Sequence, residues 1–110
     1  MAGDRFPYSA HPGDRYETVA ASQTAQVLGT TGAAGDLIRG LLIIPAVVAA
    51  GAVALLDDSA SISIFVGGGT SALVDAKPFW VELGGMRSVN GAWKITTGAN
   101  VSVIAVGRFT

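Results

Sequence analysis

Residues 86–95 read Met86-Arg87-Ser88-Val89-Asn90-Gly91-Ala92-Trp93-Lys94-Ile95, and this stretch is the clearest sign of β structure in the chain. The dipeptide Asn90-Gly91 suits a type I′ turn, because both residues accept positive φ. A two-residue turn fixes the register of the strands that it joins, which here sets Met86 opposite Ile95. We therefore predict a hairpin with Met86, Trp93 and Ile95 on the core face.

The chain on either side of this stretch carries the same kind of signal. Turn residues recur about every eight to twelve positions and separate short runs of β-branched and aromatic residues, as in sandwiches and barrels. Residues 61–66 alternate, with Ile62, Ile64 and Val66 on one face. The spacing predicts about eight short strands. We expect an all-β fold, a single jelly-roll-like β-sandwich over residues 18–110.

Residues 1–17 differ from the rest in composition. They hold the only histidine, and their apolar content is too low and too irregular for a helix or a strand pair. A short echo occurs here, since Gly3-Asp4-Arg5-Phe6 and Gly13-Asp14-Arg15-Tyr16 each place an ion pair beside an aromatic ring. We predict an extended N-terminal arm, which is either a disordered tail or a strap that docks on a neighbouring subunit. The candidate contact residues of the strap are Phe6, Tyr8 and Tyr16.

The composition argues against several classes of protein. Of the 110 residues, 14% are charged and the formal net charge is -1, which does not fit a basic nucleic-acid-binding surface. The absence of cysteine excludes disulfides and thiolate metal sites. A hydrophobic fraction of 50% is high for a small free domain. Part of the surface is therefore expected to be buried, in an assembly or in a membrane.

The most apolar segment is residues 41–56, which begins at Leu41, ends at Leu56 and contains no charged residue. A transmembrane helix needs about 20 apolar residues, and Pro45 would remove one of its backbone hydrogen bonds. The β-branched content instead favours two strands. The loop that joins them, residues 46–50, is unusually apolar for a turn. The candidate contact residues of this loop are Val47 and Val48.

Trp80 is a further candidate for a contact residue. Its strand alternates, with Phe79, Val81 and Leu83 on one face and Trp80 on the other. An exposed tryptophan can stack on a sugar ring or anchor a protein interface, whereas Trp80 is covered if both faces of the strand are buried. The last strand, within residues 101–109, is apolar on both faces, which is typical of a central strand or of one that a partner covers.

No arrangement of side chains points to catalysis. A nucleophilic triad needs a base, and the only imidazole, His11, lies in the predicted arm. The pair Asp57-Asp58 could contribute to a Ca²⁺ site, but adjacent aspartates at a strand end also suit a turn. The glycines at 67–69 lack the spacing and the lysine of a phosphate loop. We therefore predict a protein that is not an enzyme and that binds no cofactor and no metal.

Three stretches of the chain carry a resemblance to known proteins. They are Thr18-Val19-Ala20-Ala21-Ser22-Gln23-Thr24-Ala25-Gln26-Val27-Leu28-Gly29 with Gly32-Ala33-Ala34-Gly35-Asp36, then Gly40-Leu41-Leu42-Ile43-Ile44-Pro45, and finally Trp93-Lys94-Ile95-Thr96-Thr97-Gly98-Ala99-Asn100-Val101-Ser102-Val103-Ile104-Ala105-Val106-Gly107. Over residues 18–107 the chain resembles small head-decoration (capsid cement) proteins of tailed bacteriophages. The resemblance implies a β-sandwich that binds the major capsid protein and stabilises the shell, and it carries no catalytic residues.

This resemblance also sets expectations for partners and location. The major capsid protein would be the partner, and copies of the chain would form a homo-oligomer, a dimer or a trimer. The protein would be made in the host cytoplasm and lie on the capsid exterior of the virion. Two alternatives remain open. The first is a carbohydrate- or receptor-binding β module of a phage fibre or spike, with Trp80 stacked on a sugar. The second is a small membrane protein with a single span over residues 41–56.

Overall fold

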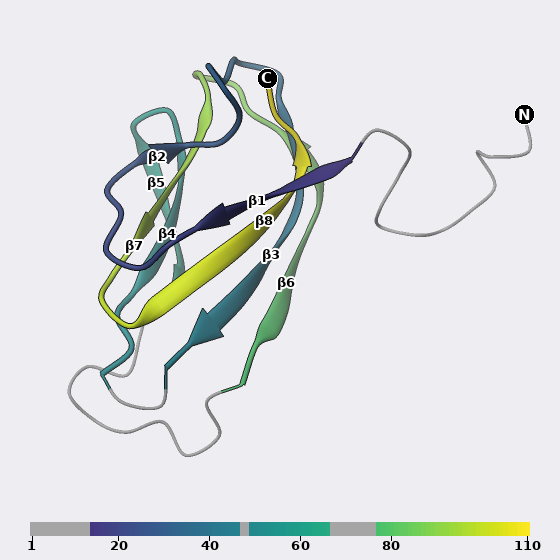
Figure 1. The fold of residues 1–110 in the computed structure, drawn as a ribbon. Helices are drawn as coiled ribbons and strands as arrows, with labels where there is room; N and C mark the ends of the chain where they lie inside the picture. Colours follow the sequence, from purple (N-terminus) through teal and green to yellow (C-terminus); the bar gives the residue numbers. More distant parts are fainter. Residues whose placement is uncertain (1–13, 47–48, 67–76) are drawn as a thin grey trace, which may run out of the picture.

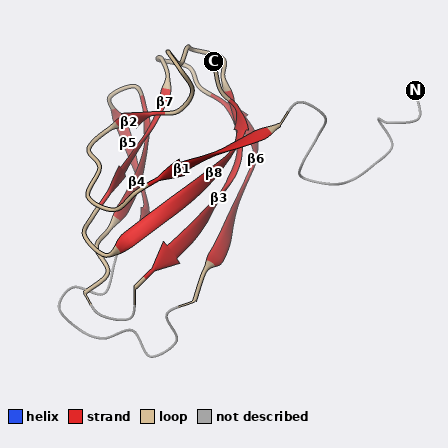
Figure 2. Cartoon of the chain, in the orientation of Figure 1, coloured by secondary structure: helices blue, strands red, loops and turns tan. Residues whose placement is uncertain are grey.

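The computed structural model describes residues 14–46, 49–66 and 77–110, and within these ranges the chain forms strands and no helix (Figure 2). The eight strands are β1 (Arg15–Val19), β2 (Gln26–Val27), β3 (Leu37–Pro45), β4 (Val53–Asp57), β5 (Ala60–Phe65), β6 (Phe79–Arg87), β7 (Trp93–Thr97) and β8 (Val101–Arg108). The prediction of an all-β fold with about eight short strands is confirmed.

The strands form two four-stranded antiparallel sheets that lie face to face (Figure 1). Sheet A has the order β1-β8-β3-β6, and sheet B has the order β2-β7-β4-β5. Strands β4 and β5 follow each other within one sheet, whereas every other pair of consecutive strands crosses to the opposite sheet. This strand order is that of a jelly roll, the form of β-sandwich that the sequence predicted.

The core lies between the sheets and is built from alternate residues of the central strands. Trp93 is only 3% exposed, and its Nε1 donates to the carbonyl oxygen of Asp36 at 2.8 Å. The prediction that Trp93 and Ile95 face the core is therefore confirmed. The other buried apolar residues of the central strands are Ile38, Leu41, Ile43, Val53, Leu55, Val101, Val103 and Ala105.

The predicted hairpin at Asn90-Gly91 is wrong. Strand β6 ends in sheet A and β7 begins in sheet B, so the segment between them crosses the sandwich instead of turning back within one sheet. Neither residue of the dipeptide has positive φ. The amides of Val89 and Asn90 donate instead to the two carboxylate oxygens of Asp57, each at 3.0 Å. These bonds to a distant side chain replace the local turn.

The position of Met86 also differs from the prediction, which set it opposite Ile95 on the core face. Met86 pairs instead with Ile38 of β3. It lies on β6, an edge strand of sheet A, and is 39% exposed. An edge strand has a neighbour on one side alone, so its core-facing residues are covered less completely.

A β-bulge interrupts the alternation that was predicted for β5. Val53 and Ala54 are consecutive on β4, but they pair with Phe65 and Ser63. Ile64 is therefore an extra residue on β5. Both Ile64 and Phe65 pack against the core, and the ring of Phe65 meets that of Phe79 edge to face, with the centroids 5.5 Å apart. Val66, which was predicted on the same face as Ile62 and Ile64, is 83% exposed.

Sheet A begins earlier in the chain than the predicted sandwich. Strand β1 starts at Arg15, and its residues pair with β8. The residues from Arg15 to Glu17 therefore belong to the sheet and not to an arm. The rest of the predicted arm, residues 1–13, lies outside the described residues.

The apolar segment of residues 41–56 forms strands at both ends, as its β-branched content predicted. Residues 41–45 lie in β3 of sheet A, and residues 53–56 lie in β4 of sheet B. A single helix over the whole segment does not agree with these two strands. Across the part of the chain that is described, no helix has the length and apolar character needed to cross a membrane.

Candidate functional site

The middle of the outer face of sheet A is apolar, with Thr18, Ser102 and Glu82 as polar neighbours, although the solvent-facing side of an antiparallel sheet usually carries mostly polar residues. The residues concerned alternate with the core residues along each strand. The two aromatic residues of this face are Tyr16, which is 71% exposed, and Trp80, which is 42% exposed. Its four aliphatic residues are partly exposed. We define the apolar face as the set Tyr16 on β1, Ile104 and Val106 on β8, Leu42 and Ile44 on β3, and Trp80 on β6.

The strand register makes the apolar face continuous across the sheet. Ile104 pairs with Leu42, which pairs in turn with Trp80 on the next strand. On the other side of the sheet, Val106 pairs with Tyr16. Every strand of sheet A therefore contributes to the face, and the two aromatic residues stand on its two edge strands.

The outer face of sheet B has a different character. Its large apolar side chains among the described strand residues are Leu56 and Val27, which both pair with Lys94, and Leu56 also pairs with Ser61. Lys94 also forms an ion pair with Asp58 at 3.3 Å. The two sheets share one core, so the fold does not require either outer face to be apolar. The outward-facing residues of β4, β5 and β7 are Ala54, Leu56, Ser61, Ser63, Lys94 and Thr96.

Trp80 is held in place by its neighbours on the apolar face. Its ring lies over the backbone of Gly40 on β3, where a Cβ would collide with it. Its Nε1 donates to Oε1 of Glu82 at 2.9 Å, and Oε2 of Glu82 accepts a hydrogen bond from the amide of Gly84 at 3.1 Å. An exposed ring that is already fixed loses little conformational freedom when a partner covers it, which favours binding.

Gly40→Ala is expected to lower the free energy of unfolding by about 1–3 kcal/mol, the usual cost of overpacking. The new methyl group would collide with the ring of Trp80 and with the carbonyl oxygen of Val81. Urea denaturation followed by circular dichroism measures the loss. Part of it should disappear in a Trp80→Ala background, because the ring is then gone. An equal loss in both backgrounds would show that the ring does not lie over this glycine.

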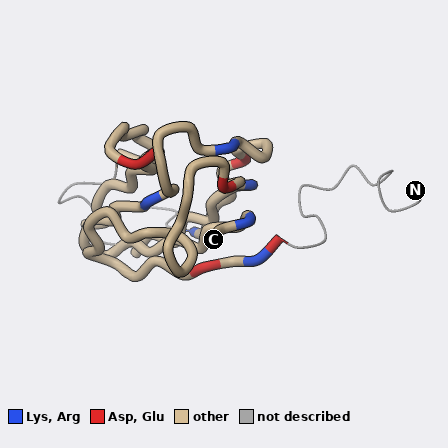
Figure 3. Tube along the Cα trace, turned by 90° about the horizontal axis from the view of Figure 1, so that it is seen from above, with Lys and Arg blue, Asp and Glu red and all other residues tan. Residues whose placement is uncertain are grey.

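An ion-pair cluster borders the apolar face where β1 begins. Oδ2 of Asp14 lies 3.3 Å from Nε of Arg39, and its Oδ1 lies 3.0 Å from Nε of Arg108. The Asp14 side chain is only 3% exposed, and a buried carboxylate requires such partners. The cluster ties the start of β1 to β3 and β8. Charged residues are otherwise sparse along the trace (Figure 3).

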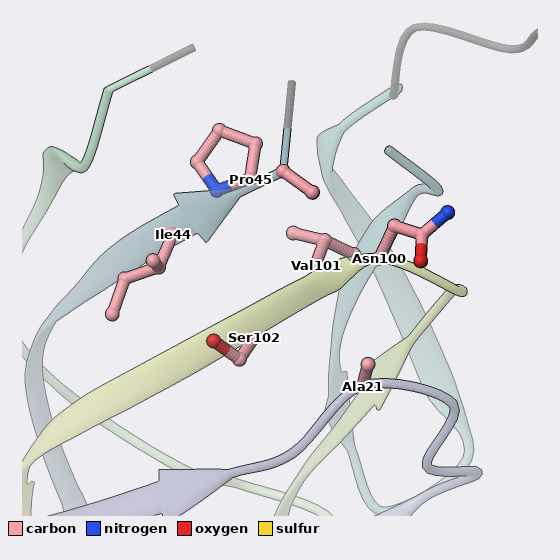
Figure 4. A pocket seen from close by; sticks show the side chains of 7 residues that line it. Ala21, Ile44, Pro45, Asn100, Val101 and Ser102 are labelled. Carbon is pink, nitrogen blue, oxygen red and sulfur yellow. The ribbon is translucent and has the colours of Figure 1, made fainter. Parts of the chain in front are cut away.

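The opposite end of the apolar face opens into a shallow depression of 240 Å³ (Figure 4). This volume is below the roughly 300 Å³ of the smallest usual ligand pockets, so we interpret the depression as an extension of the face. Ala46, the first residue of the apolar loop 46–50, is one of the residues that line the depression. The depression is lined by Ala21, Ile44, Pro45, Ala46, Asn100, Val101 and Ser102.

The apolar face brings together two of the contact residues that the sequence predicted. Tyr16 and Trp80 lie on the same side of the same sheet, at its opposite edges. The sequence prediction missed the four aliphatic residues between them, although it noted that the last strand is apolar on both sides. The remaining predicted contact residues lie outside the described residues; they are Phe6, Tyr8, Val47 and Val48.

The apolar face can bind a partner by burying apolar surface. Within residues 14–46, 49–66 and 77–110, no three His, Cys, Asp or Glu side chains converge to hold a metal ion. Comparison with protein-family models, with curated protein sequences and with solved structures finds no match to this chain. The function is therefore inferred from the geometry and burial of the face.

Proposed function

We propose that this chain is a non-catalytic virion structural protein, a capsid decoration protein that binds the major capsid shell and stabilises it. The observation that supports this proposal is the apolar face on sheet A. A protein that works in an assembly can carry such a face, because its partner covers it. The resemblance of residues 18–107 to decoration proteins suggests which partner that is. The jelly-roll fold alone does not indicate the function, since capsid proteins and lectins both have it.

The size of sheet A suits a protein interface. Its four strands, spaced about 4.8 Å apart and about eight residues long at about 3.3 Å per residue, cover roughly 500 Å². Covering this area on both partners buries about 1,000 Å² in total, which is near the lower limit for a specific complex. The adjoining depression and the loop of residues 46–50 would enlarge the contact. In this proposal the face and the loop together form the attachment surface.

Co-sedimentation with assembled shells tests the proposal. The proposal expects a major capsid gene beside the gene of this chain, and the probe is the undecorated shell that this capsid protein forms. We expect the chain to pellet with the shells, to saturate at a fixed ratio to capsid subunits, and to raise the temperature at which the shells come apart. A chain that stays in the supernatant at saturating shell concentration would overturn the proposal, as would the lack of a neighbouring major capsid gene.

A carbohydrate-binding module is the second candidate, and the arrangement of Trp80 favours it. Trp80 is 42% exposed, and the carboxylate of Glu82 beside its ring could accept hydrogen bonds from sugar hydroxyls. The neighbouring Leu42 offers such hydroxyls no partner, which makes a protein partner the better fit to the whole face. Glycan binding that Trp80→Ala abolishes and Tyr16→Ser leaves unchanged would instead favour the sugar.

A further inference from the structure

We infer that strand β5 pairs with β5 of a second copy of this chain, in antiparallel orientation. Strand β5 forms an edge of sheet B, so the pairing would join the B sheets of the two copies into one continuous sheet. This surface is separate from the apolar face of sheet A. The inference therefore stands whether or not the chain binds a capsid.

The four edge strands differ in how they are protected against pairing with another chain. Natural edges are protected by charges, by shortness, by proline or by irregular backbone. Strand β1 carries Arg15 and Glu17, β2 has only two residues, and β6 contains Gly84 and Gly85, both at positive φ. Strand β5 reads Ala-Ser-Ile-Ser-Ile-Phe and has no charge, proline or glycine. It is therefore the least protected edge of the described sandwich.

Ile62 shows that the edge at β5 is incompletely covered. It pairs with Leu55, which is fully buried, so Ile62 faces the core side of sheet B. Even so, 43% of Ile62 is exposed. Within the described residues β5 pairs with β4 alone, which leaves the backbone groups on its other side without a strand partner. A further strand would cover this side chain and supply those backbone hydrogen bonds.

Residues 61–63 of β5 read Ser-Ile-Ser and are symmetric about Ile62, and this local symmetry points to a second copy as the partner. Residues 60–63 pair with β4 in regular register, so this part of the strand is straight enough to accept a neighbour. A two-fold axis at Ile62 sets it against the partner's Ile62 and sets Ser61 against the partner's Ser63. β-branched pairs and serine pairs both favour strand association. No like charges meet, and a two-fold dimer is the commonest closed assembly.

Sedimentation velocity over a concentration series tests the inference, with a reversible monomer–dimer equilibrium as the expected result. The variant Ser61→Lys with Ser63→Lys puts like charges opposite each other twice, which should raise the dimer Kd by about tenfold or more. Both serines are exposed on the outer face, so circular dichroism should show an unchanged fold. The control Ala33→Lys with Ala34→Lys adds the same charge at exposed loop positions and should dimerise like the wild type.

Two further measurements test the register. Mixing the lysine variant with a Ser61→Glu and Ser63→Glu variant should restore the dimer through opposite charges. The variant Ile62→Cys, in a chain that has no other cysteine, should form a disulfide-linked dimer, because paired residues on antiparallel strands lie within disulfide reach. The inference is overturned by a wild type that stays monomeric at every concentration. It is overturned equally by a lysine variant that dimerises as well as the control, or by a control that loses the dimer to the same extent.

Discussion

The free energy of unfolding is expected to fall by about 3–5 kcal/mol when Trp93 is replaced by alanine, as for other buried aromatic residues. Two costs add up in this substitution. The first is a cavity, since Trp93 is 3% exposed and belongs to the core between the sheets. The second is the loss of its Nε1–H, which leaves the carbonyl oxygen of Asp36 without this hydrogen bond at a buried position.

Urea denaturation followed by circular dichroism measures the effect of Trp93→Ala. The control is Trp80→Ala, which deletes the same side chain from a position that is 42% exposed and should cost only about 1 kcal/mol. Trp93→Phe keeps much of the volume but removes the donor, so its loss should fall between the two. An unchanged denaturation midpoint for Trp93→Ala would contradict the core position of this residue.

The burial of Trp93 could be predicted from the sequence, whereas the turn before it could not. Alternation of apolar residues is a local property that survives in the fold, and it placed Trp93 and Ile95 correctly. The turn preference of Asn90-Gly91 is also local, but long-range interactions override it. Strands β6 and β7 pair with β3 and β4, which come much earlier in the chain, and the carboxylate of Asp57 binds the amides of the crossing segment.

The contact residues also differ in whether the sequence alone could identify them. Trp80 could be identified from the sequence because it stands opposite the apolar residues of an alternating strand, and Tyr16 because it is an aromatic residue of the predicted arm. Leu42 and Ile104 could not, because a continuous apolar run does not show which of its faces is turned to the core. Only the register of β3 against β8 places these two residues side by side on the outer face.

The proposed binding to shells is expected to weaken when the centre of the apolar face is made polar by Leu42→Lys together with Ile104→Glu. The two residues are a cross-strand pair, so the new side chains face each other as opposite charges, which supports the sheet and leaves the net charge unchanged. Burying an exposed side chain of this size contributes at most about 1.5–3 kcal/mol. Both residues are already partly buried, so we expect only half of the summed burial contribution of the two side chains to be lost. This loss is about 1.5–3 kcal/mol, which corresponds to roughly a tenfold to hundredfold rise in Kd.

Co-sedimentation of the variant with undecorated shells measures this loss, and circular dichroism shows whether the free chain is folded. The control is Ala54→Lys with Leu56→Glu on the outer face of sheet B, where the new glutamate lies opposite Lys94. This control makes the same change of chemistry on the other sheet and should bind like the wild type. Tyr16→Ser, at a position that is 71% exposed, tests the same face with little risk to the fold.

A folded double variant that still binds at wild-type occupancy would remove the apolar face from the capsid contact, and attachment would then fall to the loop of residues 46–50. Equal losses in the double variant and the sheet B control would show that the introduced charges, and not the position of the face, weaken binding.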